Sequence, residues 1–255
     1  MTNYEFAVTD PELDIDVKAA SVVLDRGPVG TVTVQIETKN PEDWLVSQHG
    51  DSITVRDEQS GWRLRKGQSR VRITTPDGTA ADISTASGDI TVVVATGRTV
   101  VSTASGDVRV GVASALTVKS ASGDVRVDRV TGDVSLKTAS GDLVAAAVGG
   151  RLESSTASGD VRVEEVLGNA RISTASGDIR IARFEGTDFA ANTVSGDVSL
   201  GIPSGRAVDL DVKTLSGNVS LPDRRTTPAA APSGPAGTVS IRVKSVSGDF
   251  QIQRA

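Results

Sequence analysis

The sequence has no cysteine, one histidine and few aromatic residues, which make up 3% of its 255 residues. Without cysteine it can form no disulfide and no thiolate metal site, so the usual sign of an oxidising compartment is missing. We therefore expect a cytoplasmic protein, or an extracellular one if a signal peptide has been removed. A core with so few aromatic rings must consist of Val, Ile, Leu, Ala and Thr, which suit narrow, regular stacking of strands.

The charge balance gives no general attraction to polyanions, because the net charge is −5 and the pI is near 5.0. Residues 1–18 lack a basic segment followed by an apolar one, and no run approaches the roughly 18 apolar residues of a membrane span. We expect neither a nucleic-acid partner nor membrane insertion.

A Ser-Gly-Asp or Ser-Gly-Asn triplet recurs along the chain, with successive glycines 18, 17, 18, 18, 18, 19, 21 and 31 residues apart. Such a fixed period is the signature of a repeat architecture. The first seven triplets supply the glycine and aspartate pairs Gly88-Asp89, Gly106-Asp107, Gly123-Asp124, Gly141-Asp142, Gly159-Asp160, Gly177-Asp178 and Gly196-Asp197. Gly217-Asn218 and Gly248-Asp249 complete the series.

Each repeat divides into two strands and two turns, since a second glycine follows many triplets at nine residues. Aliphatic residues stand two and four places after the triplet glycine, and a second aliphatic column stands five and seven places before it. This alternation predicts strands with one buried face, stacked coil upon coil. The predicted fold is an all-β parallel β-solenoid with coils of about 18 residues and two strands.

The two ends of the chain depart from the repeat. Residues 1–80 contain alternating stretches at 13–17, 31–36, 52–55 and 70–73, which we interpret as irregular β-rich coils that cap the solenoid of residues 81–255. Near the other end, the Pro- and Ala-rich segment 222–237 predicts a flexible insertion, after which the last coil resumes at Thr238. Because the repeats are alike, we expect any localised function in residues 1–80 or 222–237.

The column of aspartates next to the glycines needs an explanation, because neighbouring charges about 4.8 Å apart repel. We favour a structural role, in which each carboxylate accepts backbone N–H groups and pairs with the arginine two places on, as in Asp107/Arg109, Asp124/Arg126, Asp160/Arg162 and Asp178/Arg180. The alternative is a ladder of Ca²⁺ sites. Since the known calcium β-roll signature is absent, we expect no bound metal and no cofactor.

Two hydroxyl columns precede the glycine, with Thr at three places and Ser at one place before it. Parity with the aliphatic column predicts that both point inward and bond to the stack or the turn. If the corner begins earlier, the threonines instead face outward, the intervening alanines pack inside, and the threonine row resembles an ice-binding face.

Candidate interaction residues concentrate in the N-terminal region. Trp44 and Trp62 are the only tryptophans, and we expect them to pack the cap rather than stack on a ligand. Arg63, Arg65, Arg70 and Arg72 form a basic cluster that a phosphate-bearing partner could use, although strand alternation makes them a solvated outer face. His49 is the only histidine and lies beside Gly50-Asp51, which is typical of a loop, so no Ser-His-Asp constellation is indicated.

The Thr-Ala-Ser-Gly-Asp-Val/Ile series, the Leu-x-Val-x-Thr approach to it and the strand-rich beginning resemble a bacterial β-strand-repeat family of unknown function, labelled "putative adhesin" and also called Toast-rack. The resemblance implies a β-solenoid and an association with envelope or membrane stress, and it supplies no catalytic residues.

These features together predict a non-catalytic scaffold that binds a protein partner, with pairing of solenoid ends as a route to a homo-oligomer. The alternative is an adhesin-like surface module that binds glycan or Ca²⁺ along the aspartate ladder.

Overall fold

The computed structural model describes residues 1–58, 69–221 and 237–255. They form two compact units, Met1–Arg129 and Val130–Ala255. Every regular element in these ranges is a strand, apart from the short 3-10 turn η1 (Pro41–Asp43), so the all-β prediction is confirmed. Trp62, Arg63, Arg65 and the predicted insertion up to residue 236 lie outside the described residues. The predicted domain boundary at residue 80 coincides with the start of the first Ser-Gly-Asp coil and stays a prediction as a boundary.

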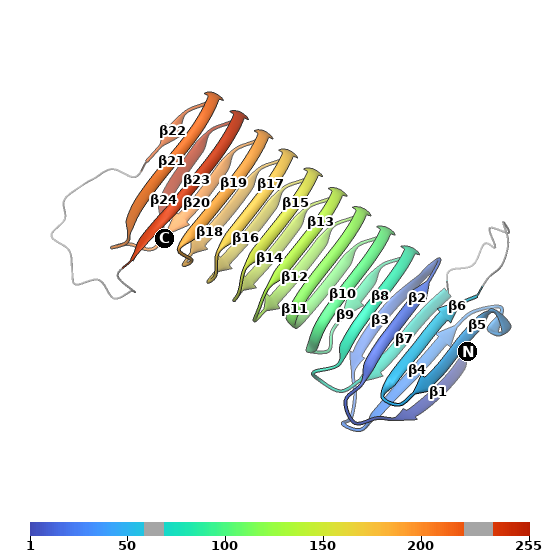
Figure 1. The fold of residues 1–255 in the computed structure, drawn as a ribbon. Helices are drawn as coiled ribbons and strands as arrows, with labels where there is room; N and C mark the ends of the chain where they lie inside the picture. Colours follow the sequence, from blue (N-terminus) through green and yellow to red (C-terminus); the bar gives the residue numbers. More distant parts are fainter. Residues whose placement is uncertain (59–68, 222–236) are drawn as a thin grey trace. The chain divides into compact units, whose positions relative to one another are not determined.

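The regular coils of the first unit wind between two sheets. Strand β8 pairs in parallel with β10, and β10 pairs with the second half of β11, while β9 pairs with the first half of β11. Each coil therefore adds one strand to each sheet, as the period predicts (Figure 1). The strands are β8 (Ala80–Ser87), β9 (Ile90–Val92), β10 (Thr96–Ser105), β11 (Val108–Ser122) and β12 (Val125–Val130).

The N-terminal coils do not stack in chain order. Strand β2 lies between β6 and β8, and β3 lies between β7 and β9, all in parallel. The first coil of the chain is thus held between later coils. The strands are β2 (Glu12–Val17), β3 (Ala20–Arg26), β6 (Ser52–Asp57) and β7 (Ser69–Thr75).

Three antiparallel strands complete this end of the first unit. Strand β4 (Thr31–Glu37) pairs with β7, β1 (Thr2–Ala7) pairs with β4, and β5 (Trp44–His49) pairs with β6. The irregular β-rich N-terminal region is confirmed, and its four predicted stretches fall in β2, β4, β6 and β7.

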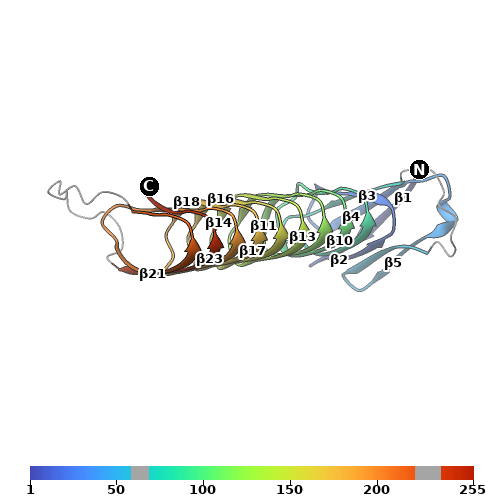
Figure 2. The same ribbon diagram turned by 90° about the horizontal axis from the view of Figure 1, so that it is seen from above.

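The second unit repeats the two-sheet arrangement, which Figure 2 shows from above. Strands β13, β15, β17 and β19 follow one another in parallel in one sheet, and β14, β16, β18 and β20 do so in the other. The strands are β13 (Val134–Ser140), β14 (Leu143–Val148), β15 (Leu152–Ser158), β16 (Val161–Val166), β17 (Ala170–Ser176), β18 (Ile179–Phe184), β19 (Asp188–Ser195) and β20 (Val198–Ile202).

The last two coils of the chain are also inverted, which corrects the predicted end. Strands β23 (Thr238–Ser247) and β24 (Phe250–Arg254) lie between β19/β20 and the earlier strands β21 (Ala207–Ser216) and β22 (Val219–Ser220). Residues after Thr238 therefore form a complete coil of their own rather than the remainder of an interrupted one. Of the coils that the structure describes, that of β21 and β22 is the outermost one in this unit.

The core of each unit consists of the predicted aliphatic columns. Ile90, Val108, Val161 and Ile179, two places after a triplet glycine, are each at most 1% exposed. The second column is equally buried, except in β21, whose inward side chains are covered on one side by no coil of the described residues.

The triplet glycines meet two requirements at the corner. They adopt positive φ, for example +128° at Gly106 and +143° at Gly177, where side chains are disfavoured. A Cβ on Gly106 would also lie 2.3 Å from the carbonyl oxygen of Gly88 in the preceding coil. At the second corner of each coil, glycine is required only because the neighbouring coil approaches closely. Gly168 and Gly186 lack positive φ, but a Cβ on them would lie 2.2 and 2.1 Å from a carbonyl oxygen of that coil.

Candidate functional site

The aspartate ladder is a structural feature of the corners. In most of the ladder the backbone N–H of an aspartate donates to Oδ1 of the aspartate in the neighbouring coil, over 3.0 Å from Asp107 to Asp89 and 2.8 Å from Asp160 to Asp142. The predicted acceptor role is therefore confirmed, but the donor comes from the next coil rather than from the same turn.

The other carboxylate oxygen of several ladder residues pairs with arginine. Asp107 Oδ2 lies 3.2 Å from Arg109, Asp124 Oδ2 lies 3.0 Å from Arg126, and Asp160 pairs with Arg162. Arg126 and Arg162 also reach the preceding aspartate, at 3.8 and 3.4 Å. The fourth predicted pair, Asp178 with Arg180, is not among the ion pairs of the described residues. These contacts offset the repulsion along the ladder.

The two hydroxyl columns point in different directions. Thr85, Thr103 and Thr156 are buried, and each donates to the carbonyl oxygen two residues later, for example over 3.0 Å from Thr103 to Ser105. The serines at the corner, such as Ser87 and Ser105, are exposed, so the inward prediction was right for threonine and wrong for serine. The alternative with outward threonines was also wrong. The chain has already begun to turn when it reaches the serine.

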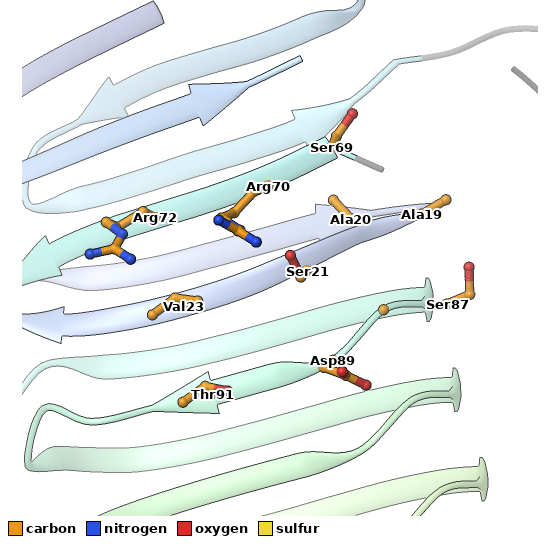
Figure 3. Close-up of a pocket in the computed structure, with 11 residues that line it drawn as sticks. Ala19, Ala20, Ser21, Val23, Ser69, Arg70, Arg72, Ser87, Asp89 and Thr91 are labelled. Atoms are coloured by element: carbon orange, nitrogen blue, oxygen red, sulfur yellow. The ribbon is translucent and has the colours of Figure 1, made fainter. Parts of the chain in front are cut away.

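A depression of about 770 Å³ lies on the outer face of the first unit, over β7, β3 and β9 (Figure 3). Arg70 and Arg72 of β7 stand along one side, and short side chains of the next two strands form the floor. The register explains this shape, since Ser21 is opposite Arg70, and Val23 is opposite both Arg72 and Thr91. We call this surface the Arg70–Arg72 groove. Its lining residues are Ala19, Ala20, Ser21, Val23, Ser69, Arg70, Arg72, Ser87, Gly88, Asp89 and Thr91.

The electrostatics of the groove leave both guanidinium groups accessible. The side chain of Arg70 is 56% exposed and lies 4.0 Å from Glu37, while that of Arg72 is 51% exposed and lies 3.1 Å from Asp25. Surface ion pairs of this kind contribute about 0–1 kcal/mol, so an incoming carboxylate can replace the internal partner at little cost. The groove can therefore bind an acidic group between its arginine side and its hydroxyl-bearing floor.

The structure brings together only some of the predicted interaction residues. Arg70 and Arg72 lie in the groove, whereas Trp44 is buried in β5, at 8% exposure, and its indole nitrogen has no hydrogen-bond partner among the described residues. Asp89, predicted as a corner residue, also borders the groove. Ser21, Val23 and Thr91 were missed because β3 and β9 are distant from β7 in sequence and meet it only through the inverted stacking.

No constellation of catalytic or metal-binding residues appears among the described residues. His49 is exposed at the end of β5, opposite Ser52 in a hairpin. Residues 1–58, 69–221 and 237–255 contain no group of three or more His, Asp or Glu placed to hold a metal ion. The same ranges contain no helix long and apolar enough to span a membrane.

Comparison with known proteins gives one family match. The model of the family described as Toastrack DUF4097 matches residues 11–253. No curated protein matches the chain.

Solved structures similar to the chain share little sequence with it. A "putative adhesin" from Parabacteroides distasonis ATCC 8503 is 12% identical, with 98% of this chain and 96% of that chain covered and a TM-score of 0.48. A "putative lipid binding protein" from the same organism is 15% identical over 100% and 96% of the two chains, with a TM-score of 0.48. A "putative adhesin" from Parabacteroides merdae ATCC 43184 is 10% identical over 98% and 96%, with a TM-score of 0.44. The family match indicates no catalytic family.

Proposed function

Because the chain belongs to the Toastrack family DUF4097, whose model matches residues 11–253, and that match brings no catalytic family with it, we propose that it is a non-catalytic interaction module. Its ligand is an acidic segment of a protein partner, which binds in the Arg70–Arg72 groove. The observation that carries this proposal is the position of two accessible guanidinium groups beside a floor of short side chains.

A protein segment fits the groove better than a dense polyanion. The protein has a net charge of −5, so a nucleic acid would meet overall repulsion beyond the two arginines. A segment with a few carboxylates needs only local complementarity. Arginine can hold a carboxylate through two parallel hydrogen bonds, which gives orientation as well as attraction.

The aspartate ladder is a weaker candidate for ligand binding. Its Oδ1 atoms accept backbone N–H groups of the next coil, and several Oδ2 atoms pair with arginine. A cation or a glycan would have to displace these contacts at every coil. The Ca²⁺ and glycan alternative therefore has no specific observation in its favour.

Selection from a displayed peptide library tests the proposal. Peptides are selected on the wild-type protein and then compared on the double variant R70Q/R72Q and on the matched control R109Q/R126Q, which removes two arginines from the same unit outside the lining. We expect the selected peptides to be enriched in Asp and Glu, and to bind R70Q/R72Q at least about tenfold more weakly, equivalent to about 1.4 kcal/mol. Binding to the control should change by less than about twofold. Selected peptides without acidic residues, or equal loss in both variants, would refute the assignment.

A further inference from the structure

Among the described residues, the outermost coil of the second unit leaves part of the apolar core uncovered. Val208, Leu210 and Val212 of β21 are half-buried, whereas their neighbours Val239 and Ile241 on β23 are fully buried. Val219 and Leu221, on and beside β22, are 44% and 56% exposed. Among the described residues β21 pairs only with β23, so its other edge presents free backbone groups over ten residues.

The orientation of the backbone shows which residues of β21 face the open edge. The backbone N–H of Ser240 on β23 donates to the carbonyl of Thr187, so Ser240 directs its backbone groups toward β19 and the next residue, Ile241, directs its groups toward β21. In a parallel pair a residue bonds to the two residues that flank its partner, and the partner of Ile241 is Leu210. Asp209, Asp211 and, by alternation, Lys213 therefore direct their backbone groups toward β23, whereas Leu210 and Val212 direct theirs toward the open edge.

The first unit shows how this fold ends a parallel sheet. There β4 pairs antiparallel with β7, and Glu37 lies directly opposite Arg70. An added antiparallel strand with opposite charges across the pair thus closes the parallel edge of β7. No described strand does the same for β21.

From these observations we propose that a second copy of the chain closes the open edge, through antiparallel pairing of β21 with β21 of the partner about a two-fold axis at Val212. A two-fold contact uses the same strand on both copies. Residues with outward backbone groups must pair with each other, so the axis passes through a residue rather than between two.

The charges of β21 select Val212 as the centre. With the axis at Leu210, Asp209 would lie opposite the partner's Asp211. With the axis at Asp211 or at Lys213, that residue would lie opposite its own copy, so two like charges would face each other. An axis at Val212 places Asp211 opposite the partner's Lys213 twice, and like charges opposite one another are avoided.

The residues of β23 beside Asp211 and Lys213 favour the same pairing. Lys213 already lies beside Lys244 on β23, and Asp211 lies beside Arg242. Within the chain, Lys213 Nζ is 3.9 Å from Asp211 Oδ2, a loose contact with 70% and 57% of the two side chains exposed. A carboxylate from the partner would offset the repulsion between Lys213 and Lys244.

A single-cysteine experiment tests the axis, because the chain has no cysteine of its own. In the proposed pair Val212 faces itself as a hydrogen-bonded pair of an antiparallel sheet, with about 5.5 Å between Cα atoms, which a disulfide can span. Under mild oxidation V212C should therefore form covalent dimers. The control L210C, which faces the partner's Thr214, should form at least about tenfold fewer. Equal cross-linking of the two variants, or none with V212C, would overturn the proposal.

A charge exchange provides the second test, read as molar mass by light scattering over a range of protein concentrations. The single variants D211K and K213D should each be monomeric, because each places like charges opposite one another. An equimolar mixture of the two should form a heterodimer, since all facing pairs are then opposite in sign. Circular dichroism checks that each variant is folded. A wild-type monomer at every concentration, or dimers of either single variant as stable as the wild type, would contradict the proposed interface.

Discussion

The backbone N–H of Asp178 donates a hydrogen bond of 2.8 Å to Oδ1 of Asp160, one coil earlier. The same contact links Asp197 to Asp178 at 2.9 Å and Asp249 to Asp197 at 2.8 Å. The triplet aspartate is thus a connection between coils, with its negative charge a secondary feature. This distinction can be tested by substitution.

Replacing Asp160 by Asn should have little effect on stability, since the amide oxygen can still accept the N–H of Asp178. Replacing it by Ala removes the acceptor and should cost about 1 kcal/mol, because this N–H is partly accessible to water. Urea denaturation compares the two variants, and added Ca²⁺ should shift neither midpoint. If Asn destabilised as much as Ala, the carboxylate charge and not the acceptor would be the important property.

Replacing Gly106 by Ala should destabilise the first unit by more than about 3 kcal/mol, because the new Cβ adds a steric conflict to an unfavourable backbone conformation. That Cβ would lie 2.3 Å from the oxygen of Gly88, at a φ of +128°. The matched control is Gly78, which has a φ of +89° and no atom within 4 Å of the position that a Cβ would occupy. Its replacement by Ala should cost about 1–2 kcal/mol.

Chemical denaturation of the two glycine variants provides the measurement. Equal losses would mean that backbone conformation alone requires glycine at the corner, and that close stacking of coils contributes nothing. The larger loss of stability is expected for Gly106 because neither this glycine nor the carbonyl of Gly88 in the neighbouring coil can move without disturbing two coils.

Two threonines of the same column should respond differently to replacement by Val. Thr156 Oγ1 donates to the carbonyl of Ser158 over 3.1 Å, and its loss should cost about 1 kcal/mol. Thr174 Oγ1 is buried without a hydrogen-bond partner among the described residues, so T174V should leave stability unchanged or raise it by up to about 1 kcal/mol. Thermal and urea midpoints of both variants decide the matter. A loss in T174V as large as in T156V would show that the hydroxyl of Thr174 has a partner after all.

The ion pair between Arg26 and Asp77 should be visible in a pH titration. The hydrogen bond from Arg26 Nε to Asp77 Oδ1, 3.0 Å long, lowers the pKa of the Asp77 carboxyl, and the positive charge adds to this effect. A carboxyl with a lowered pKa in the folded state stabilises the fold above its unfolded pKa, and this contribution is lost as the pH falls through the folded pKa.

Carboxyl carbon NMR of the wild type and of R26Q measures the titration of Asp77 directly. In R26Q the pKa should rise toward the ordinary aspartate value of about 3.9. An unchanged pKa in the variant would show that Arg26 is not the cause of the shift.

The sequence predicted the repeating part of the fold because each coil must satisfy the same constraints. The aliphatic columns, the corner glycines and the acceptor role of residues such as Asp107 follow from the period and from strand alternation. The direction of Ser87 did not follow, because parity holds only within a straight strand and fails once the chain turns. The order of coils at the two ends did not follow either. The spacing of the repeats gives only the order of the coils along the chain. The position of β23 between β19 and β21 depends on which strand buries more apolar surface there, and the spacing does not contain that information.

The candidate site was predictable only in part for the same reason. Arg70 and Arg72 could be identified by their charge and their alternation with buried residues. Their neighbours Ser21 and Thr91 lie on strands brought beside β7 by the inverted stacking, and short polar residues carry no signal of their own in a sequence rich in them.

The most direct test of the central claim is site-specific photo-cross-linking in the native cell. A photoreactive residue replaces Ser21 on the floor of the Arg70–Arg72 groove, and the control carries it at Ser135, a half-buried outer-face serine of β13 in the second unit. The account predicts a protein cross-linked at Ser21 through a segment rich in Asp and Glu, lost in the R70Q/R72Q background and absent with the probe at Ser135. Cross-links that persist without the two arginines, that occur equally at Ser135, or that map to a segment without acidic residues would contradict it.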